Sequence, residues 1–195
     1  MKMFTLLAVA AAVLALANTN ASQTFAETQE SSPPAIGSSA GGSSKQTITA
    51  GGAHVAQDAF ESIKKLSGKW QASLPDGRPI VDVFRPFAYG TAVLGEEWVG
   101  GEQVTSTVFY VVGSELRADH YCDLKNQPHY VAKSSADLSI IEFEFRGATN
   151  LDTHPTHFHS TKWRLVDASH LIQDWRIEGD PKGPTELHLD FRRTE

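Results

Sequence analysis

The chain has 195 residues, a formal net charge of −6 and a single cysteine. The acidic balance and the lack of any basic run argue against a nucleic-acid partner or an anionic membrane surface as a partner. One cysteine excludes an intramolecular disulfide, so the fold must be stabilised by burial of apolar side chains.

The N-terminus has the order of regions that is typical of a secretory signal peptide. Lys2 precedes an apolar stretch at residues 4–16, and small and polar residues follow it up to Ala21. The stretch is shorter than the roughly 20 residues that a membrane-spanning helix requires. We therefore expect cleavage after Ala21, or alternatively after Ala26, no membrane span in the mature protein, and a periplasmic or secreted location.

Residues 22–57 are predicted to form a disordered tether. Ser, Gly, Pro, Gln, Thr and Ala dominate this segment, and large apolar side chains are almost absent up to residue 53. Such a composition buries too little surface to offset the entropy of ordering the chain. We expect the folded domain to span residues 58–195.

A short amphipathic helix is predicted at the start of the domain. Asp58 and Glu61 have the spacing of a helix-capping pair, and Ile63 and Leu66 continue one apolar face. The helix should end near Gly68.

Everything beyond Gly68 has the pattern of strands separated by turn residues. About ten antiparallel strands joined by hairpins are expected, at residues 69–73, 80–85, 91–99, 103–112, 115–122, 129–133, 138–146, 157–166, 171–178 and 186–192. Closure into an up-and-down barrel buries the apolar face of such a sheet and removes its edges. We therefore predict an all-β barrel with one N-terminal helix and an interior cavity; a β-sandwich is the alternative.

Alternation along the strands places histidine and cysteine inside this barrel. His120 and Cys122 share a face with apolar residues of their strand. His157 and His159 are placed inward because Lys162 and Arg164 are expected to face solvent, and Trp163 shares their side. Trp175 is predicted to point inward from the next strand.

The carboxylates Glu96 and Glu97 must face opposite sides of their strand, so one of them can point inward. A carboxylate near His120 could orient the imidazole or supply acid-base chemistry. The commoner outcome for a glutamate is exposure to solvent.

Two sets of motifs resemble known protein families. Gly68-Lys69-Trp70, at the start of the first strand, resembles the Gly-x-Trp signature of lipocalins and other calycins, which implies that Trp70 closes one end of the barrel. A longer series between residues 66 and 191 resembles a group of uncharacterised bacterial lipocalin-like proteins: His120-Tyr121-Cys122, Asn126-Gln127-Pro128, Gly147-Ala148-Thr149-Asn150-Leu151, His157-Phe158-His159 and Gln173-Asp174-Trp175.

The resemblance implies a barrel with an unusual interior, and it does not imply a reaction. In the group the second motif is commonly Gly-Asn-Gln-Pro, and this chain has Lys125 where the glycine would be. If that position requires a left-handed turn, Lys125 must be strained there or must reshape the turn.

The function predicted from these features is that of an exported, lipocalin-like protein that binds a small, largely apolar ligand. The candidate ligand contacts are His120, Cys122, Asn126, Gln127, Asn150, His157, His159, Trp163 and Trp175. The alternatives are a metal-assisted or acid-base enzyme that uses the interior His/Cys group, and a non-catalytic structural or interaction domain. The sequence assigns no catalytic residue, no metal, no cofactor and no oligomeric state.

The histidines themselves allow three interpretations. Two imidazoles of a His-x-His pair are about 6.6 Å apart at the backbone and can reach one metal. Haem or another ligand could contact them, or they could belong to a structural hydrogen-bond network with Asn126, Gln127, Thr149 and Asn150. In a barrel of sequential strands, His120 and His157 are separated by roughly 14 Å along the wall and can meet only across the lumen.

Overall fold

The computed structural model describes residues 50–195, with side chains from residue 54 onward. The predicted signal peptide and residues 22–49 of the predicted tether lie outside the described residues. The elements are α1 (Ala50–Lys64), β1 (Gly68–Ser73), β2 (Pro79–Phe87), a 3-10 turn η1 (Ala88–Gly90), β3 (Ala92–Val99), β4 (Glu102–Val112), β5 (Glu115–Cys122), β6 (Pro128–Ala132), β7 (Ile140–Ala148), β8 (His157–Asp167), β9 (His170–Glu178) and β10 (Thr185–Arg193).

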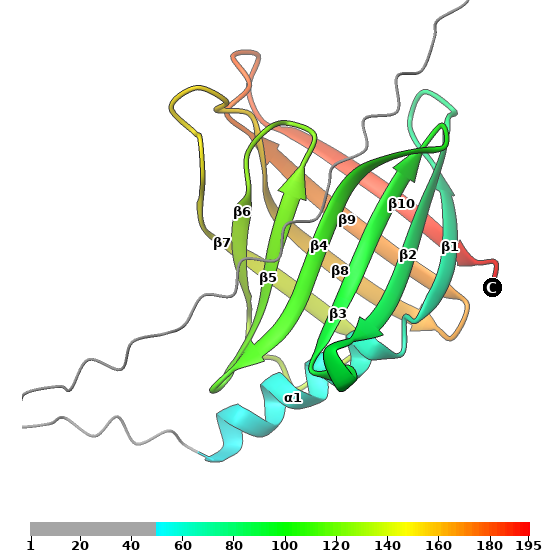
Figure 1. The fold of residues 1–195 in the computed structure, drawn as a ribbon, viewed down its shortest axis with the longest axis vertical. Helices are drawn as coiled ribbons and strands as arrows, with labels where there is room; N and C mark the ends of the chain where they lie inside the picture. Colours follow the sequence, from blue (N-terminus) through cyan, green and yellow to red (C-terminus); the bar gives the residue numbers. More distant parts are fainter. Residues whose placement is uncertain (1–49) are drawn as a thin grey trace, which may run out of the picture. The chain divides into compact units, whose positions relative to one another are not determined.

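The ten strands form a closed antiparallel barrel in which each strand pairs with its neighbours in sequence (Figure 1). Pairing of β1 with β10 completes the ring through Trp70 opposite Arg193 and Gln71 opposite Arg192. The predicted all-β barrel is confirmed, and the β-sandwich is excluded. The ten predicted strands agree with the observed ones to within about two residues at each end.

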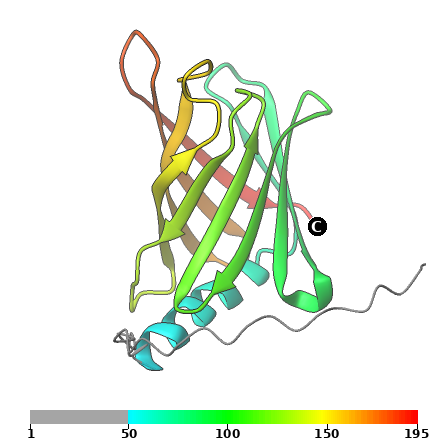
Figure 2. The same ribbon diagram turned by 60° about the vertical axis from the view of Figure 1, so that its left-hand side comes forward.

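Helix α1 lies across one end of the barrel, and the hairpins of the other end leave that end uncovered by a helix (Figures 1 and 2). Phe60, Ile63 and Leu66 are buried at the closed end. The helix is neither long nor apolar enough to cross a membrane. Ligands can therefore approach the interior from the open end.

The predicted start of the helix at Asp58 is wrong. The helix begins at Ala50, and the predicted boundary between tether and domain at residue 58 falls inside it. Ser62 Oγ donates to the Asp58 backbone oxygen at 3.2 Å, a bond between residues one turn apart within a helix. Residues 53–57 contain no turn-forming residue, so the helix continues upstream of the apparent cap.

Trp70 closes the barrel beside the helix, as the Gly-x-Trp resemblance implies. Its indole Nε1 donates to the Leu66 carbonyl at 2.7 Å, and the Arg193 guanidinium lies 4.2 Å from the ring centroid. Arg193 also donates to the carbonyls of Lys65, Ser67 and Ala168. Gly68 has φ +120°, and a Cβ there would lie 2.3 Å from the Glu195 backbone oxygen, so the motif requires glycine.

Side chains fill more of the barrel interior than is expected from the number of strands alone. Phe84, Phe109, Phe143 and Trp163 pack with ring centroids 5.3–6.5 Å apart in the half nearer the helix. Large aromatic side chains occupy the volume that strand number alone would leave open. The expectation of an open interior cavity is therefore wrong for most of this half, which keeps only a space of about 20 Å³ beside Phe84, Phe109 and Trp163.

Candidate functional site

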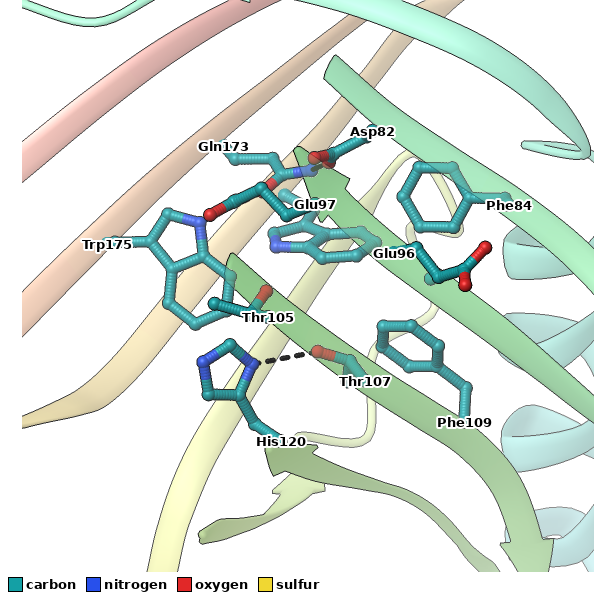
Figure 3. Close-up of a pocket in the computed structure, with 12 residues that line it drawn as sticks. Asp82, Phe84, Glu96, Glu97, Thr105, Thr107, Phe109, His120, Gln173 and Trp175 are labelled. Carbon is teal, nitrogen blue, oxygen red and sulfur yellow. Dashed lines mark hydrogen bonds between the residues drawn. The ribbon is translucent and has the colours of Figure 1, made fainter. Parts of the chain in front are cut away.

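Two carboxyl side chains stand side by side inside the barrel, on β2 and β3. Asp82 and Glu97 are direct cross-strand partners, so their Cβ atoms lie about 5 Å apart on the inner face. Asp82 is only 5% exposed, between the inward-facing Ile80 and Phe84. Glu96 points away from Glu97 and forms an ion pair with Arg85 (Figure 3).

Asp82 is held by a hydrogen-bond chain that begins on β9. Trp175 Nε1 donates to Gln173 Oε1 at 2.9 Å, and Gln173 Nε2 donates to Asp82 Oδ2 at 2.8 Å. The indole N–H can only donate, which fixes the orientation of the glutamine amide. The chain leaves Asp82 Oδ1 buried without a hydrogen-bond partner among the described residues.

His120 supplies a second buried polar atom without a partner at this site, one of four such side-chain atoms among the described residues. Its side chain is 3% exposed, and Nδ1 lies 2.8 Å from Thr107 Oγ1 on the neighbouring strand β4 (Figure 3). Nε2 has no hydrogen-bond partner within the described chain. Burial lowers the His120 pKa to about 4, so the imidazole is neutral at pH 7. The predicted inward orientation of His120 is confirmed.

Burial also keeps protons on the carboxyl pair. Desolvation raises the pKa of Asp82 to about 7, although the hydrogen bond from Gln173 opposes this. Desolvation, followed by the charges of Asp82 and Asp123, raises the pKa of Glu97 to about 8. The pair therefore changes its protonation near neutral pH, where few unperturbed groups titrate.

Two adjoining spaces make the site accessible. A deep cavity of about 20 Å³ is lined by Asp82, Glu97, Thr105, His120 and Trp175, among others, and has room for about one water molecule. A mouth pocket of about 180 Å³ extends toward the open end and shares Glu97, Thr105 and Trp175 with the deep cavity. We call the two together the interior site.

The wall of the mouth pocket is largely apolar, and the polar floor of the interior site is formed by Asp82, Glu97 and His120. The apolar side chains that line it are Leu74, Ile80, Val99, Val104, Phe158, Trp175, Leu187 and Leu189. A largely apolar wall with a few converging polar groups is the usual form of a small-molecule site. Its volume lies below the 300–1,000 Å³ of typical sites for drug-sized ligands, so haem does not fit it as it stands.

The predicted inward orientation of His157 and His159 is wrong. Phe158 is paired with Ile177 and Ser160 with Arg176, which leaves His159 as an extra residue in a β-bulge. The bulge turns Phe158 inward, where its ring lies 5.5 Å from that of His120. The two histidines consequently lie on the other side of β8.

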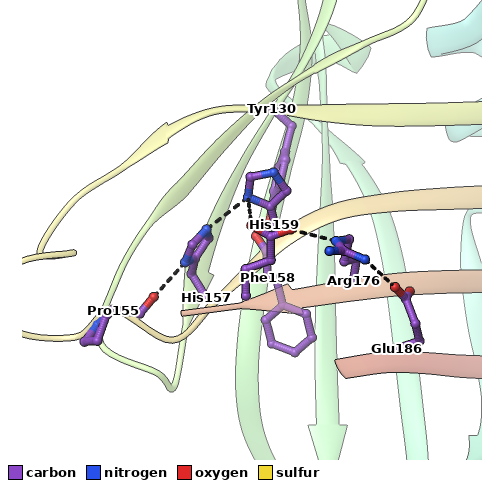
Figure 4. A network of polar contacts seen from close by, with 8 residues as sticks. Tyr130, Pro155, His157, Phe158, His159, Arg176 and Glu186 are labelled. Carbon is purple, nitrogen blue, oxygen red and sulfur yellow. Dashed lines mark hydrogen bonds and ion pairs between the residues drawn. The ribbon is translucent and has the colours of Figure 1, made fainter. Parts of the chain in front are cut away.

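His157 and His159 fill a gap in the barrel wall. Strands β7 and β8 pair only from Ile140 to Phe143, and further along the Phe145 ring packs against both imidazoles at 4.8 and 4.7 Å. His157 Nδ1 donates to the Pro155 carbonyl at 2.7 Å, and His157 Nε2 lies 3.2 Å from His159 Nδ1 (Figure 4).

A chain of charged groups extends this contact outward. His159 Nδ1 lies 3.5 Å from a Glu178 carboxylate oxygen, and Arg176 joins Glu178 to Glu186 at 2.7 and 3.0 Å. This network belongs to the outer wall and does not contact the interior site. No three His, Cys, Asp or Glu side chains in the described part of the chain are grouped so as to hold a metal ion.

The predicted contacts Asn126, Gln127 and Asn150 connect loops at the open end instead of lining the interior site. Asn126 is fully buried and donates to the carbonyls of His154 and Thr156 at 2.9 and 2.7 Å. Asn150 Nδ2 donates to the Lys125 carbonyl at 3.0 Å, and Gln127 is bonded to Thr149. These residues hold the loop after β5 against the loop after β7.

Cys122 is half-buried at the end of β5. Burial raises the pKa of its thiol to about 12, so the nucleophilic thiolate is scarce at pH 7. The predicted cavity residues Trp163 and Trp175 do line the deep cavity, Trp163 as part of the aromatic packing and Trp175 next to Glu97.

Asp82 is not among the predicted site residues, although the sequence contains a signal for it. Ile80, Asp82 and Phe84 alternate in one strand, and two apolar neighbours at i−2 and i+2 place a carboxylate on the core face. Gln173 lies in the same way between Leu171 and Trp175. A polar residue flanked in this pattern is the feature that marks the interior site.

Comparisons with known proteins extend to the fold only. No protein-family model and no curated protein matches the sequence. Among solved structures, the chain is similar to Rv2717c from M. tuberculosis, with a TM-score of 0.53 and 13% identity over 70% of this chain and 98% of that one. A protein of unknown function from the DUF3598 family of Nostoc punctiforme aligns with a TM-score of 0.39 and 12% identity, over 68% of this chain and 49% of that one. The likeness to Rv2717c supports the barrel fold.

Proposed function

We propose that this protein is a lipocalin-like barrel that binds a small molecule in the interior site. The observation that carries the proposal is the pair of buried polar atoms without partners, Asp82 Oδ1 and His120 Nε2, which line one cavity. A buried polar group without a partner costs about 1–3 kcal/mol, so a ligand that bonds to both atoms gains affinity. The lipocalin-like assignment is supported by Trp70 and Arg193 at the closed end.

The geometry favours a ligand with an apolar body and one polar end. The apolar wall of the mouth pocket would contact the body, while Glu97, Asp82 and His120 would contact the polar end. This differs from the largely apolar ligand expected from the sequence, because the floor of the site carries two carboxyl groups.

The test is to fill the site and measure ligand retention. Native mass spectrometry of the full chain purified under mild conditions should detect a bound small molecule, and Thr105→Phe, which places a ring where the two spaces meet, should abolish it. Ser106→Phe, at the adjacent outward position of β4, is the matched control and should retain the ligand. Equal retention by both variants would contradict the proposal.

A second candidate, acid-base catalysis, is favoured by the carboxyl pair whose pKa values lie near 7 and 8. Two adjacent carboxyls that share a proton can act as acid and base at neutral pH. Incubation of the co-purifying molecule with wild type and Glu97→Gln distinguishes the two functions. Chemical change with wild type alone would establish catalysis, whereas an unchanged molecule supports binding.

We further propose that the protein is exported and that cleavage after Ala21 or Ala26 leaves the barrel on an N-terminal tether. The support is the order of charged, apolar and small residues in the first 26 positions. Cell fractionation with intact-mass measurement should find a chain in the periplasm or medium that begins at Ser22 or Glu27. An intact Met1 terminus in the cytoplasmic fraction would rule this out.

A further inference from the structure

The interior site carries acidic groups and almost no positively charged ones. Asp82 and Glu97 line its deep part and Asp123 its rim. No lysine lines either space in the described structure, and the single lining arginine, Arg78, is engaged at 2.8 Å by Asp76 outside the pocket. An anionic ligand would meet repulsion here and find no buried cation to bind.

Aromatic rings stand next to these carboxyl groups. Trp175 lines both spaces beside Glu97, and Phe158 packs edge-on against Trp175 with centroids 5.3 Å apart. The face of an aromatic ring carries partial negative charge and attracts ammonium groups, most strongly when they are removed from water. Carboxylates and aromatic rings together are complementary to an organic cation.

Building on the ligand-binding function proposed above, we propose that the interior site binds a small organic cation, a primary alkylammonium ion. Its charged head lies between Asp82 and Glu97, and its alkyl chain lies against Phe158 and Trp175.

The hydrogen-bonding capacity of the site matches that head group. A primary ammonium has three N–H donors and no acceptor. Asp82 Oδ1 and the Glu97 carboxylate oxygens are acceptors for them. Asp82 Oδ1 thereby gains the partner that it lacks.

A metal ion fits the same floor less well. Among the described residues no three potential ligand groups converge there. A bare ion would also make no contact with the apolar wall of the mouth pocket, so that wall would contribute nothing to its binding. An alkylammonium ion uses both the polar floor and the apolar wall.

Cation binding and proton binding compete at this site. The cation favours the charged carboxylates, so it must displace protons from Asp82 and Glu97, and its affinity should rise between pH 6 and pH 8.5. The ligand itself remains charged, since alkylammonium groups lose their proton near pH 10.

Other titratable groups face the pair from three sides. They are His120 and Cys122 on β5, Asp123 in the following loop and Arg78 at the rim. His120 and Cys122 stay neutral between pH 6 and pH 8.5, because burial moves their pKa values to about 4 and about 12. The change of affinity with pH therefore reports on the carboxyl pair.

The experiment compares three probes of similar length on the full chain: n-butylammonium chloride, 1-butanol and sodium butyrate. Binding is followed by tryptophan fluorescence and by titration calorimetry at pH 6 and pH 8.5. Butylammonium should bind tightest, and between pH 6 and pH 8.5 its affinity should rise about tenfold through displacement of the Asp82 proton and a further several tens of fold through displacement of the Glu97 proton. Calorimetry in buffers of different ionisation enthalpy should show proton release near pH 7.

Substitutions then locate the binding. Glu97→Gln should weaken butylammonium binding about tenfold and reduce the proton release, with Asp82→Asn as the second variant if the first does not fold. Glu142→Gln removes a carboxylate from the outer face of β7, where it pairs with Lys133 and Lys162, and should leave binding unchanged.

The outcomes separate the two proposals. If 1-butanol or butyrate binds as tightly as butylammonium, or if affinity is independent of pH, the cation inference is overturned and the ligand-binding function stands. If no probe binds and native mass spectrometry finds no retained molecule, both fail.

Discussion

Asp82 combines a charge-bearing side chain with nearly complete burial, and only one of its two oxygens is hydrogen-bonded. Such a group is stable in the core when it keeps its proton. At the scale of single residues, this makes stability depend on pH.

Wild type should become less stable as pH rises from 6.5 to 8.5. The double variant Asp82→Asn/Glu97→Gln should not show this loss of stability. The folded pKa values of about 7 and about 8 lie above the ordinary values of 3.8 and 4.5, so the stabilisation from these protons is complete below pH 4 and is lost as pH rises through 8. Wild type should lose about 3 kcal/mol over this window.

Urea denaturation at four pH values checks this dependence. The window lies above the range in which His120 contributes, because its lowered pKa reduces stability only as pH falls from 6.5 toward 4. Parallel profiles of wild type and double variant would show that the carboxyls are not the cause.

Lys125 adopts a left-handed conformation with φ +68°, as the glycine expected at this position from the family resemblance suggests. A residue with a side chain costs about 1–2 kcal/mol in this region, and the greater freedom of glycine in the unfolded chain offsets part of that. We expect Lys125→Gly to raise the free energy of unfolding by about 0.5 kcal/mol. A decrease in the urea midpoint, compared with Lys125→Ala as control, would contradict this.

At the scale of elements, the closed end depends on the contact between β10 and the segment that joins α1 to β1. Arg193 donates to three carbonyls there and stacks on Trp70. Arg193→Ala should lower the free energy of unfolding by about 1–2 kcal/mol, because three backbone carbonyls lose a charged donor and Trp70 loses the stacked cation. Arg193→Lys should recover only part of this, since an ammonium cannot span three carbonyls in one plane. Thermal denaturation of both variants measures the difference.

The partial pairing of β7 with β8 predicts uneven protection from exchange. Amides of residues 140–143 lie in the paired part of β7, whereas residues 145–148 face the gap that Phe145 and the two histidines fill. The amides of residues 157–160 of β8, which lie along this gap, should exchange faster than those of residues 161–164, which pair with β7. Tyr130→Phe, which removes the bond to the Phe158 carbonyl at 2.5 Å, should accelerate it further. Uniform protection along β8 would argue against a weak wall.

At the scale of the whole molecule, one continuous core joins all ten strands and the helix. Each strand pairs with the next, so most pairings form over short sequence distances, and only β1 with β10 requires closure of a long loop. Unfolding should consequently be a single transition, with coincident midpoints from far-ultraviolet circular dichroism and tryptophan fluorescence. Separate midpoints would show that the helix or the β1–β10 seam unfolds independently.

The whole barrel was predictable from the sequence because turn residues and alternation report on local geometry. Face assignments for β5 held, since Leu116, Ala118 and His120 keep a regular alternation. In β8 they failed, because alternation cannot reveal an inserted residue when histidine and phenylalanine are equally acceptable on either side. The volume of the cavity also escaped prediction, since it depends on how rings from distant strands pack together.

Two irregularities each add one residue to β8 relative to β9, one at His159 and one at Val166 near the other end of the strand. His159 is the surplus position of the first, so its deletion should restore a regular ladder there while Phe158 and Thr161 keep their faces. Deletion of Lys162 would instead force the residues on one side of it onto the opposite surface. Between Phe158 and Leu165, β8 thus has one position where the gene can lose a codon and the protein can keep its interior, and that position encodes the second histidine of the His157-Phe158-His159 motif.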